Sequence, residues 1–339
     1  MSDDFPLGVY ALHPDWPDAQ FSVSGLMCHA PLLFAYFQIV EMGFGCRPPI
    51  AAVYDAPAVP WNGGRLKELS FGIESLARIT EAFNLRNVGC FLTFTNHLLE
   101  RRDLEDPTCN ELLDCIAQRP DINGVVVASA LLSQYVERKH PELRRIASVI
   151  KVTMEEGRGN PRYYQDLGAR FNRYVVHPDD CRDLGLLDQL DRCKAEILVN
   201  ENCLRGCSTR AQHYDAIARA QKDLRRVQSQ SAEEVASRLA SCRYASSMQE
   251  LEQAMAGCGS TPLMRQIGRW QRNCNLTRGE LKTLYGMGFR FLKLQGRTDN
   301  VFGYAYDLVR YTLEPDVAAP LVYKTICPVI TADARGPAK

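Results

Sequence analysis

Two cysteines are separated by three residues in the segment that follows a short apolar run, Val199-Asn-Glu-Asn-Cys-Leu-Arg-Gly-Cys-Ser-Thr-Arg-Ala-Gln-His213. The thiols of Cys203 and Cys207 can turn toward one metal ion or cluster, because Gly206 between them lets the backbone fold tightly. Arg210 and His213 follow in the same stretch. A thiolate metal site with polar neighbours is therefore one interpretation of this segment.

Two thiols do not complete such a site, and the chain has 13 cysteines from which more ligands can come. We expect Cys258 and Cys274 to complete it, with Cys242 in reserve, because Cys258 lies between two glycines and Cys274 precedes a helix-entry turn. Four thiolates can hold either a [4Fe–4S] cluster or zinc. Core packing is the competing interpretation, and we expect it for Cys90 and Cys115.

A second group of polar residues ends the last strand-like run, Phe289 to Leu294. Lys293, Gln295 and Arg297 alternate with apolar residues, so they share one face of the strand. Cationic side chains on one face suit an anionic substrate, whose carboxylate or phosphate a guanidinium can bind with two hydrogen bonds. A surface strand stabilised by salt bridges is the alternative.

A third candidate is the loop Tyr54-Asp-Ala-Pro-Ala-Val-Pro-Trp-Asn-Gly-Gly-Arg65. We expect Trp61, Asn62 and Arg65 to form a stacking and hydrogen-bonding wall for a substrate, together with Arg210 and His213. A loop that only turns the chain is the alternative. In Met27-Cys28-His29, we expect His29 to be structural rather than a ligand.

The elements that must position these residues alternate along the chain. Short apolar runs typical of buried parallel strands alternate with amphipathic helical stretches. The predicted strands are Ile50–Tyr54, Val88–Phe94, Gly124–Ala128, Ala147–Val152, Arg173–Val176, Glu196–Val199 and Phe289–Leu294. About seven such units favour a closed (β/α) barrel, the TIM-like architecture, in which residues that follow strands meet at one mouth. No Gly-x-Gly-x-x-Gly follows an early strand, which disfavours a dinucleotide-binding open sheet.

The alternation stops in a polar, helical segment before the last strand. We therefore divide the chain into a barrel (1–207 and 276–327), a helical insertion over its mouth (208–275) and a flexible tail (328–339). The insertion would cover the end of the barrel where active sites are built.

Composition and charge narrow the function classes. With 40 Lys+Arg against 40 Asp+Glu, the net charge is zero, so bulk nucleic-acid binding is unexpected. No run of 18 apolar residues predicts a membrane span, and the first residues lack the pattern of a signal peptide. We expect a cytoplasmic protein, whose cysteines stay reduced.

The final strand carries a family resemblance. Gly288-Phe-Arg-Phe-Leu-Lys-Leu-Gln-Gly-Arg297 resembles the Gly-Val-x-x-Leu-Lys-Ile-Glu-Gly-Arg motif of the collagenase-like peptidase family, which includes oxygen-independent hydroxylases of ubiquinone biosynthesis and RNA-hydroxylating proteins. The resemblance implies a (β/α) barrel and a [4Fe–4S] cluster on four cysteines near the mouth. Gln295 replaces the motif's Glu, and the family's Glu-x-Phe-x-His-Gly-x-Met-Cys block is absent, so a divergent member is implied.

The sequence therefore favours an iron–sulfur barrel enzyme that hydroxylates or otherwise oxidises or reduces a biosynthetic intermediate, a peptide or RNA. No Ser/His/Asp or Cys/His arrangement is recognisable as a hydrolytic set, so an oxidoreductase is expected rather than a peptidase. Two alternatives remain. One is a zinc-stabilised barrel with other chemistry, and the other is a non-catalytic, cluster-bearing partner subunit.

Overall fold

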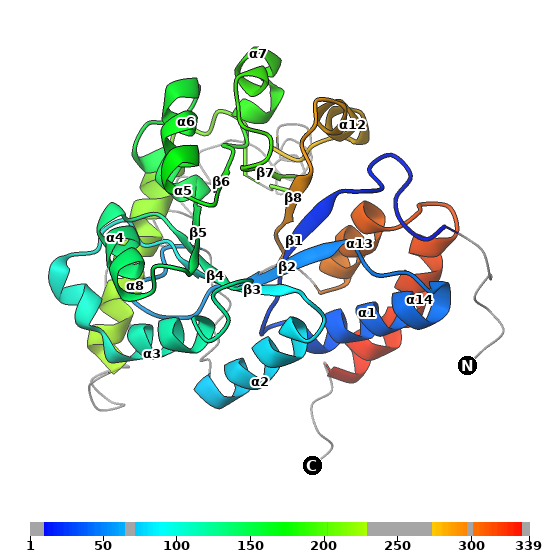
Figure 1. Ribbon diagram of the computed structural model, residues 1–339, viewed down its shortest axis with the longest axis horizontal. Helices are drawn as coiled ribbons and strands as arrows, with labels where there is room; N and C mark the ends of the chain where they lie inside the picture. The colour runs from blue at the N-terminus through cyan, green and yellow to red at the C-terminus, as the bar shows by residue number, and fades with distance from the viewer. Residues whose placement is uncertain (1–9, 65–71, 202, 229–272, 297–300, 334–339) are drawn as a thin grey trace, which may run out of the picture.

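The computed structural model describes residues 10–64, 72–201, 203–228, 273–296 and 301–333. Within this part of the chain, eight parallel strands close into a barrel in sequence order, with β8 paired to β1 (Figure 1). The strands are β1 (Gln20–Ser24), β2 (Ile50–Asp55), β3 (Gly89–Phe94), β4 (Gly124–Val127), β5 (Arg144–Ala147), β6 (Arg173–Val175), β7 (Ala195–Leu198) and β8 (Phe291–Leu294). The predicted TIM-like (β/α) barrel is confirmed.

Helices surround the barrel and connect its strands. They are α1 (Ala30–Phe44), α2 (Ile73–Asn84), α3 (Pro107–Ile116), α4 (Ala130–Lys139), α5 (Val149–Met154), α6 (Pro161–Arg170), α7 (Leu184–Asp188), α8 (Arg210–Gln228), α12 (Arg278–Gly286), α13 (Val301–Thr312) and α14 (Ala318–Asp333), with 3-10 turns η1 (Arg101–Glu105) and η2 (Asp180–Arg182). Side chains fix several helix starts. Asn160 caps α6, and Thr277 forms a reciprocal capping box with Glu280 at α12.

Two strands differ from the sequence prediction. The apolar run Ala147–Val152 is not one strand, because β5 ends at Ala147 and the Ser148 hydroxyl accepts a hydrogen bond from the Ile150 N–H to start α5. In a short run of apolar residues, hydrophobic periodicity does not distinguish a buried strand from a buried helix. Strand β1 was not predicted, since only Phe21 and Val23 alternate with polar residues there.

The strands separate two apolar layers. Their outward-facing side chains, such as Val53, Leu92 and Val125, pack with the helices in the main core. The inward-facing side chains form a smaller cluster inside the barrel, made of Ala52, Tyr54, Phe91, Val126, Ile146, Val175 and Leu198. The alternation of faces along each strand thus decides which residues can reach the barrel interior.

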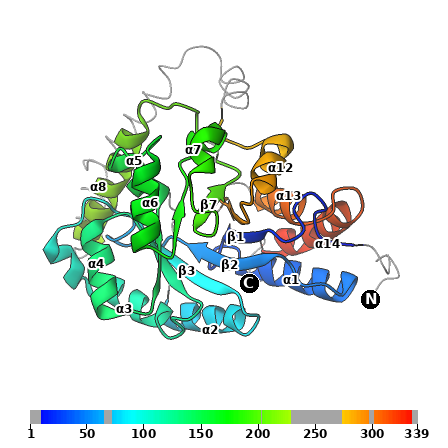
Figure 2. The same ribbon diagram turned by 45° about the horizontal axis from the view of Figure 1, so that its top comes forward.

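The predicted insertion begins as helix α8. This helix packs beside α5 and near α4 (Figure 2). The Asn96 amide, after β3, donates to the carbonyl of Ala218 over 3.0 Å, which fixes α8 against the barrel. Residues 229–272 lie outside the described part of the chain.

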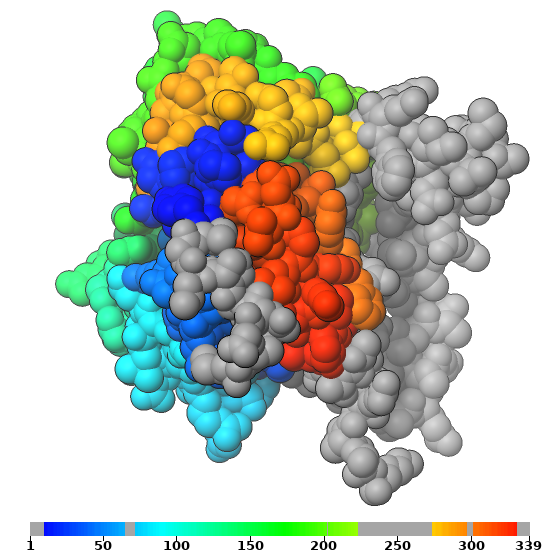
Figure 3. All heavy atoms as spheres, turned by 90° about the vertical axis from the view of Figure 1, so that its right-hand side faces the viewer, coloured from blue at the N-terminus to red at the C-terminus, as the bar shows by residue number. Residues whose placement is uncertain are grey.

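The two ends of the described chain meet on one face. Helix α14 packs against α1 and α13, and Leu12 pairs with Leu313 in an isolated antiparallel bridge (Figure 3). Helix α14 continues past Pro328 to Asp333, so the first six residues of the predicted tail (328–339) are helical. No helix among the described residues is both long and apolar enough to span a membrane.

Candidate functional site

A pocket of about 100 Å³ opens at the carboxyl ends of the strands, where barrel enzymes place their active sites. It is lined by Tyr54, Gly64, Thr93, Thr95, Val126, Ser148, Val149, Ile150, Val175, Leu198, Glu201, Tyr214, Lys293, Gln295 and Gly296. Lys293 and Gln295 therefore share this pocket, as their predicted common face requires. Their role in substrate binding stays a prediction.

Lys293 reaches the pocket from inside the barrel. Its ammonium lies 3.2 Å from Glu196 Oε2 on β7 and 4.0 Å from the centre of the Tyr54 ring. Glu196 is fully buried and accepts a second hydrogen bond, of 2.6 Å, from the Ser22 hydroxyl. A buried carboxylate and a buried ammonium are stable here because each neutralises the other. The barrel interior thus presents a fixed cation to the pocket floor.

Gln295 connects the segment that follows β8 to the segment that follows β7. Its backbone N–H donates to Asn200 Oδ1 over 2.8 Å, and the Asn200 amide donates back to the Gln295 carbonyl over 2.9 Å. The Gln295 side-chain amide donates to Glu201 Oε1 over 3.2 Å. The same oxygen of Glu201 accepts from the Cys203 N–H over 2.8 Å. Glu201 therefore links the pocket directly to the cysteine loop.

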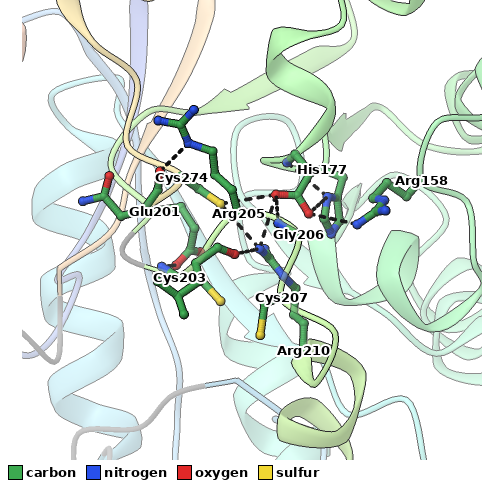
Figure 4. Close-up of polar contacts among 12 residues, drawn as sticks. Arg158, His177, Glu201, Cys203, Arg205, Gly206, Cys207, Arg210 and Cys274 are labelled. Carbon is green, nitrogen blue, oxygen red and sulfur yellow. Dashed lines mark hydrogen bonds and ion pairs between the residues drawn. The ribbon is translucent and has the colours of Figure 1, made fainter. Parts of the chain in front are cut away.

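Three of the predicted thiol ligands are brought together next to this pocket. The Cys274 N–H donates to the Cys203 carbonyl over 2.9 Å, in a short antiparallel pairing that includes the bridge between Leu204 and Asn273. Cys207 follows a turn at Gly206, whose φ of 59° favours glycine. Figure 4 shows the three thiols around the side chain of Arg210. Two segments far apart in sequence thus supply cysteines to one region.

Asp179, in the loop after β6, holds this region in place. Its Oδ1 accepts from the Gly206 N–H over 3.0 Å and from the Cys274 thiol over 3.5 Å, while its Oδ2 pairs with Arg158 over 3.0 Å. Burial acts to raise the pKa of Asp179, but the Gly206 hydrogen bond and the charge of Arg210 outweigh it, so the pKa is lowered. Asp179 is therefore a carboxylate that fixes the cysteine loop.

Arg210 is buried among the cysteines, with 3% of its surface exposed. Its Nη2 donates to the Leu204 carbonyl over 2.8 Å and lies 3.4 Å from the Cys274 sulfur. Burial raises the pKa of the Cys274 thiol to about 11, and the hydrogen bond from Arg210 opposes this shift. Arg210 Nη1 is buried and has no hydrogen-bond partner among the described residues. Arg210 thus contacts a thiol and the backbone, and it is not among the residues that line the mouth pocket. Its role in substrate binding stays a prediction.

His213 continues the same region along α8. Its Nε2 lies 3.2 Å from the Thr209 hydroxyl, which lies 3.4 Å from the Cys207 sulfur. His213 is therefore close to a cysteine and is absent from the lining of the mouth pocket.

Metal ligation needs more than this proximity. Within the described ranges, no group of three or more His, Cys, Asp and Glu side chains is arranged to hold a metal ion. Cys258 and the reserve Cys242 lie outside those ranges, and so do Arg65 and Arg297. The assignment of Cys203, Cys207, Cys258 and Cys274 as ligands stays a prediction. Cys90 is fully buried, as expected, and Cys115 is half-buried against the core.

The predicted aromatic wall has a different role. Trp61 is fully buried, packs edge-on against Phe94 and Tyr135, and donates its indole N–H to the Asp103 carbonyl over 2.7 Å. Asn62 is also fully buried, and its side chain exchanges hydrogen bonds with the backbone of Gly64. Both side chains are thus used to fix the loop, and neither lines the mouth pocket. A role of Trp61 and Asn62 in substrate binding stays a prediction.

His29 is buried and stacks on Tyr304 with 4.5 Å between ring centres, which agrees with the expected structural role. The prediction did not include Asp179, Glu196 or Glu201. Asp179 carried a weak signal, since Pro178-Asp-Asp interrupts the chain directly after an apolar strand. Glu196 gave none, because a lone acid at the start of a strand is typical of solvent exposure.

The sequence matches no protein-family model and no curated protein. Among solved structures, it is similar to a U32 peptidase at 11% identity and a TM-score of 0.48, over 82% of this chain and 92% of that one. An α-amylase from Geobacillus thermoleovorans, complexed with acarbose, matches at 12% identity and a TM-score of 0.34, over 62% of this chain and 66% of that one. At these levels, neither likeness assigns a family or an activity.

Proposed function

We propose that this barrel is an iron–sulfur oxidoreductase. Cys203, Cys207 and Cys274 would bind a [4Fe–4S] cluster, with Cys258 as the fourth ligand, next to the mouth pocket. The observation that carries the proposal is the backbone hydrogen bond from Cys274 to Cys203, which joins two cysteine-bearing segments at the rim. Four thiolates are the usual ligand set of such a cluster.

The local chemistry suits an anionic, sulfide-rich group. Arg210 lies among the thiols, and its buried Nη1 lacks an acceptor within the described chain. Hydrogen bonds to sulfur and exclusion of water are the means by which a protein tunes a cluster. The thiols would have to turn toward a common point, since the described side chains do not form a ligand set as they stand.

The bound cluster would supply electron transfer with a substrate in the pocket. The proposed reaction is an oxygen-independent hydroxylation or a related redox change of a biosynthetic intermediate, a peptide or RNA. In the hydroxylation, water would supply the oxygen atom, two protons would be released, and two electrons would pass one at a time through the cluster to an external electron acceptor. Lys293, whose charge Glu196 balances, would donate a hydrogen bond to a polar group of the substrate, and Gln295 and Glu201 would orient the substrate through further hydrogen bonds. The pocket volume of about 100 Å³ favours a small reacting group.

Anaerobic purification followed by iron, sulfide and zinc analysis tests the proposal. We expect equal amounts of iron and sulfide, about four of each per chain, and a brown protein. Cys203→Ala and Cys274→Ala should each abolish the colour, while Cys90→Ala, which removes a fully buried thiol on the outer face of β3, should keep it. Zinc without sulfide would contradict the cluster, as would full iron content in Cys203→Ala.

A further inference from the structure

The opposite end of the barrel is hollow as well. A cavity of about 370 Å³ opens at the amino ends of the strands, where Ala52 and Gly89 contribute almost no side-chain bulk. A Cβ atom on Gly124 would lie 2.4 Å from the Arg144 carbonyl oxygen and 2.5 Å from the Phe91 ring. The packing of β4 thus requires glycine at this position, beside the cavity-lining residues Phe91 and Arg144. In many (β/α) barrels, layers of bulky side chains fill this space.

Arginines line this cavity. Arg144 and Arg173 are the first residues of the neighbouring strands β5 and β6. Each lies two residues before an inward-facing residue, Ile146 or Val175, so both arginines are on the inward face of their strands. The Arg173 guanidinium stacks on the Phe291 ring, 3.5 Å from its centre, which holds it in a fixed orientation.

A third arginine, Arg47, lies at the rim, where its Nη2 donates to the carbonyls of Arg86 and Asn87 over 2.8 and 3.0 Å. No carboxylate is among the described residues that line the cavity. Three guanidinium groups therefore surround one space without an acidic partner in its wall.

Charge inside the barrel is not balanced at this end. Along the eight described strands, the inward-facing charged residues are Arg144, Arg173, Glu196 and Lys293. Glu196 is already bound by Lys293 and Ser22. Burial is the main cause that lowers the pKa of Arg173, and the positive charge of Arg144 lowers it further, against the attraction of Glu196. Arg144 and Arg173 thus repel each other, and the two acidic groups that interact with them are already paired, Glu196 with Lys293 and Asp121 with Arg119.

We propose that this cavity is a binding site for a small multivalent oxyanion, either a phosphorylated molecule or a polycarboxylate. Guanidinium groups bind both kinds of oxyanion with paired, charge-assisted hydrogen bonds. An anion with two or more charges would neutralise Arg144 and Arg173 together, and the cavity is large enough for more than one acidic group. The site lies at the other end of the barrel from the thiols, so it does not depend on the proposed cluster.

Isothermal titration of the full-length chain with pyrophosphate and with citrate, at constant ionic strength, tests this site and separates the two classes of ligand. We expect saturable binding of at least one probe. Arg144→Gln and Arg173→Gln should each weaken that binding about tenfold or more, the effect of losing one charged hydrogen bond. Arg47→Gln should weaken it less, because this guanidinium keeps backbone partners at the rim. The matched control is Arg138→Gln, an exposed arginine in the last turn of α4, which should leave binding unchanged.

Two results would overturn the proposal. One is the absence of binding by both probes, and the other is equal loss of affinity in Arg138→Gln and Arg144→Gln, which would indicate diffuse surface charge. Arg144 is exposed, so its replacement leaves the fold in place and keeps the test valid even if Arg173→Gln is unstable.

Discussion

Lys293 and Glu196 form an ion pair inside the barrel, with 3.2 Å between Nζ and Oε2. They belong to the neighbouring strands β8 and β7, whose backbone pairing places Leu198 beside Lys293 and Glu196 beside Phe291. The pair therefore lies diagonally across two strands, in a space closed by the barrel wall. Such a pair is costly to break, because either partner alone would be a buried charge without compensation.

A double-mutant cycle measures this dependence. Glu196→Gln and Lys293→Met should each lower the free energy of unfolding by about 3–5 kcal/mol, and the double variant should lose much less than the sum. Urea denaturation at neutral pH gives the four values. The pair of the partly exposed Arg192 and the exposed Asp188 is a suitable control, and its cycle should give less than about 1 kcal/mol. Additive losses for Glu196 and Lys293 would contradict the coupling.

Two buried histidines predict an acid-dependent loss of stability. Burial is the main cause that lowers the pKa of His13 and of His177 from 6.5 to about 4 in each case. In each ring, Nδ1 accepts the backbone N–H of the residue two positions later, Asp15 or Asp179, which requires an unprotonated Nδ1. Below pH 6.5 the unfolded chain binds protons that the folded chain does not. The free energy of unfolding should therefore fall between pH 6.5 and 4 and then change little through these two groups.

His13→Asn and His177→Asn test this dependence, because asparagine can accept the same backbone hydrogen bond without titrating. Each variant should flatten the decline between pH 6.5 and 4 in chemical denaturation experiments. His140→Asn, which replaces a partly exposed histidine on the surface, serves as the control. A decline of unchanged steepness in both variants would show that other groups cause the acid sensitivity.

Asp179 is predicted to act as a positioning residue for the cysteine loop. Asp179→Asn removes the charge that faces Arg158 and Arg210 and weakens the acceptor for the Gly206 N–H. We expect a loss of about 1–3 kcal/mol in stability and faster hydrogen exchange of the Gly206 amide. Asp188→Asn, on an exposed helix end, should change neither quantity. Unchanged protection of the Gly206 amide would exclude the positioning role.

Sequence patterns predicted on which face of a strand a residue lies, whereas its contacts depend on how the strands and loops pack. Alternation along Phe289–Leu294 placed Lys293 and Gln295 on one face, and both line the pocket. Alternation predicts the face of a strand on which a residue lies but not its partners on that face. The ion pair of Glu196 with Lys293 could therefore not be predicted, because it depends on the pairing of β7 with β8. The cysteine loop is similar: spacing pairs Cys203 with Cys207, whereas Asp179 joins them only through the order of strands in the barrel.

The type of a residue does not by itself predict its role, as Trp61 shows, and the burial of this side chain can be tested. A tryptophan next to two glycines in a rim loop is typical of a ligand-stacking wall, yet the indole is fully buried and hydrogen-bonded to Asp103. Trp61→Ala should therefore lower the free energy of unfolding by about 3–5 kcal/mol, the cost of an emptied aromatic site in a core. Gln295→Ala, at the half-buried rim of the pocket, should cost less, about 1–3 kcal/mol, through its lost side-chain hydrogen bonds. Urea denaturation of the two variants provides the comparison. A loss below about 1 kcal/mol for Trp61→Ala would return this residue to the pocket wall, because only a side chain that leaves the core in solution could be removed so cheaply.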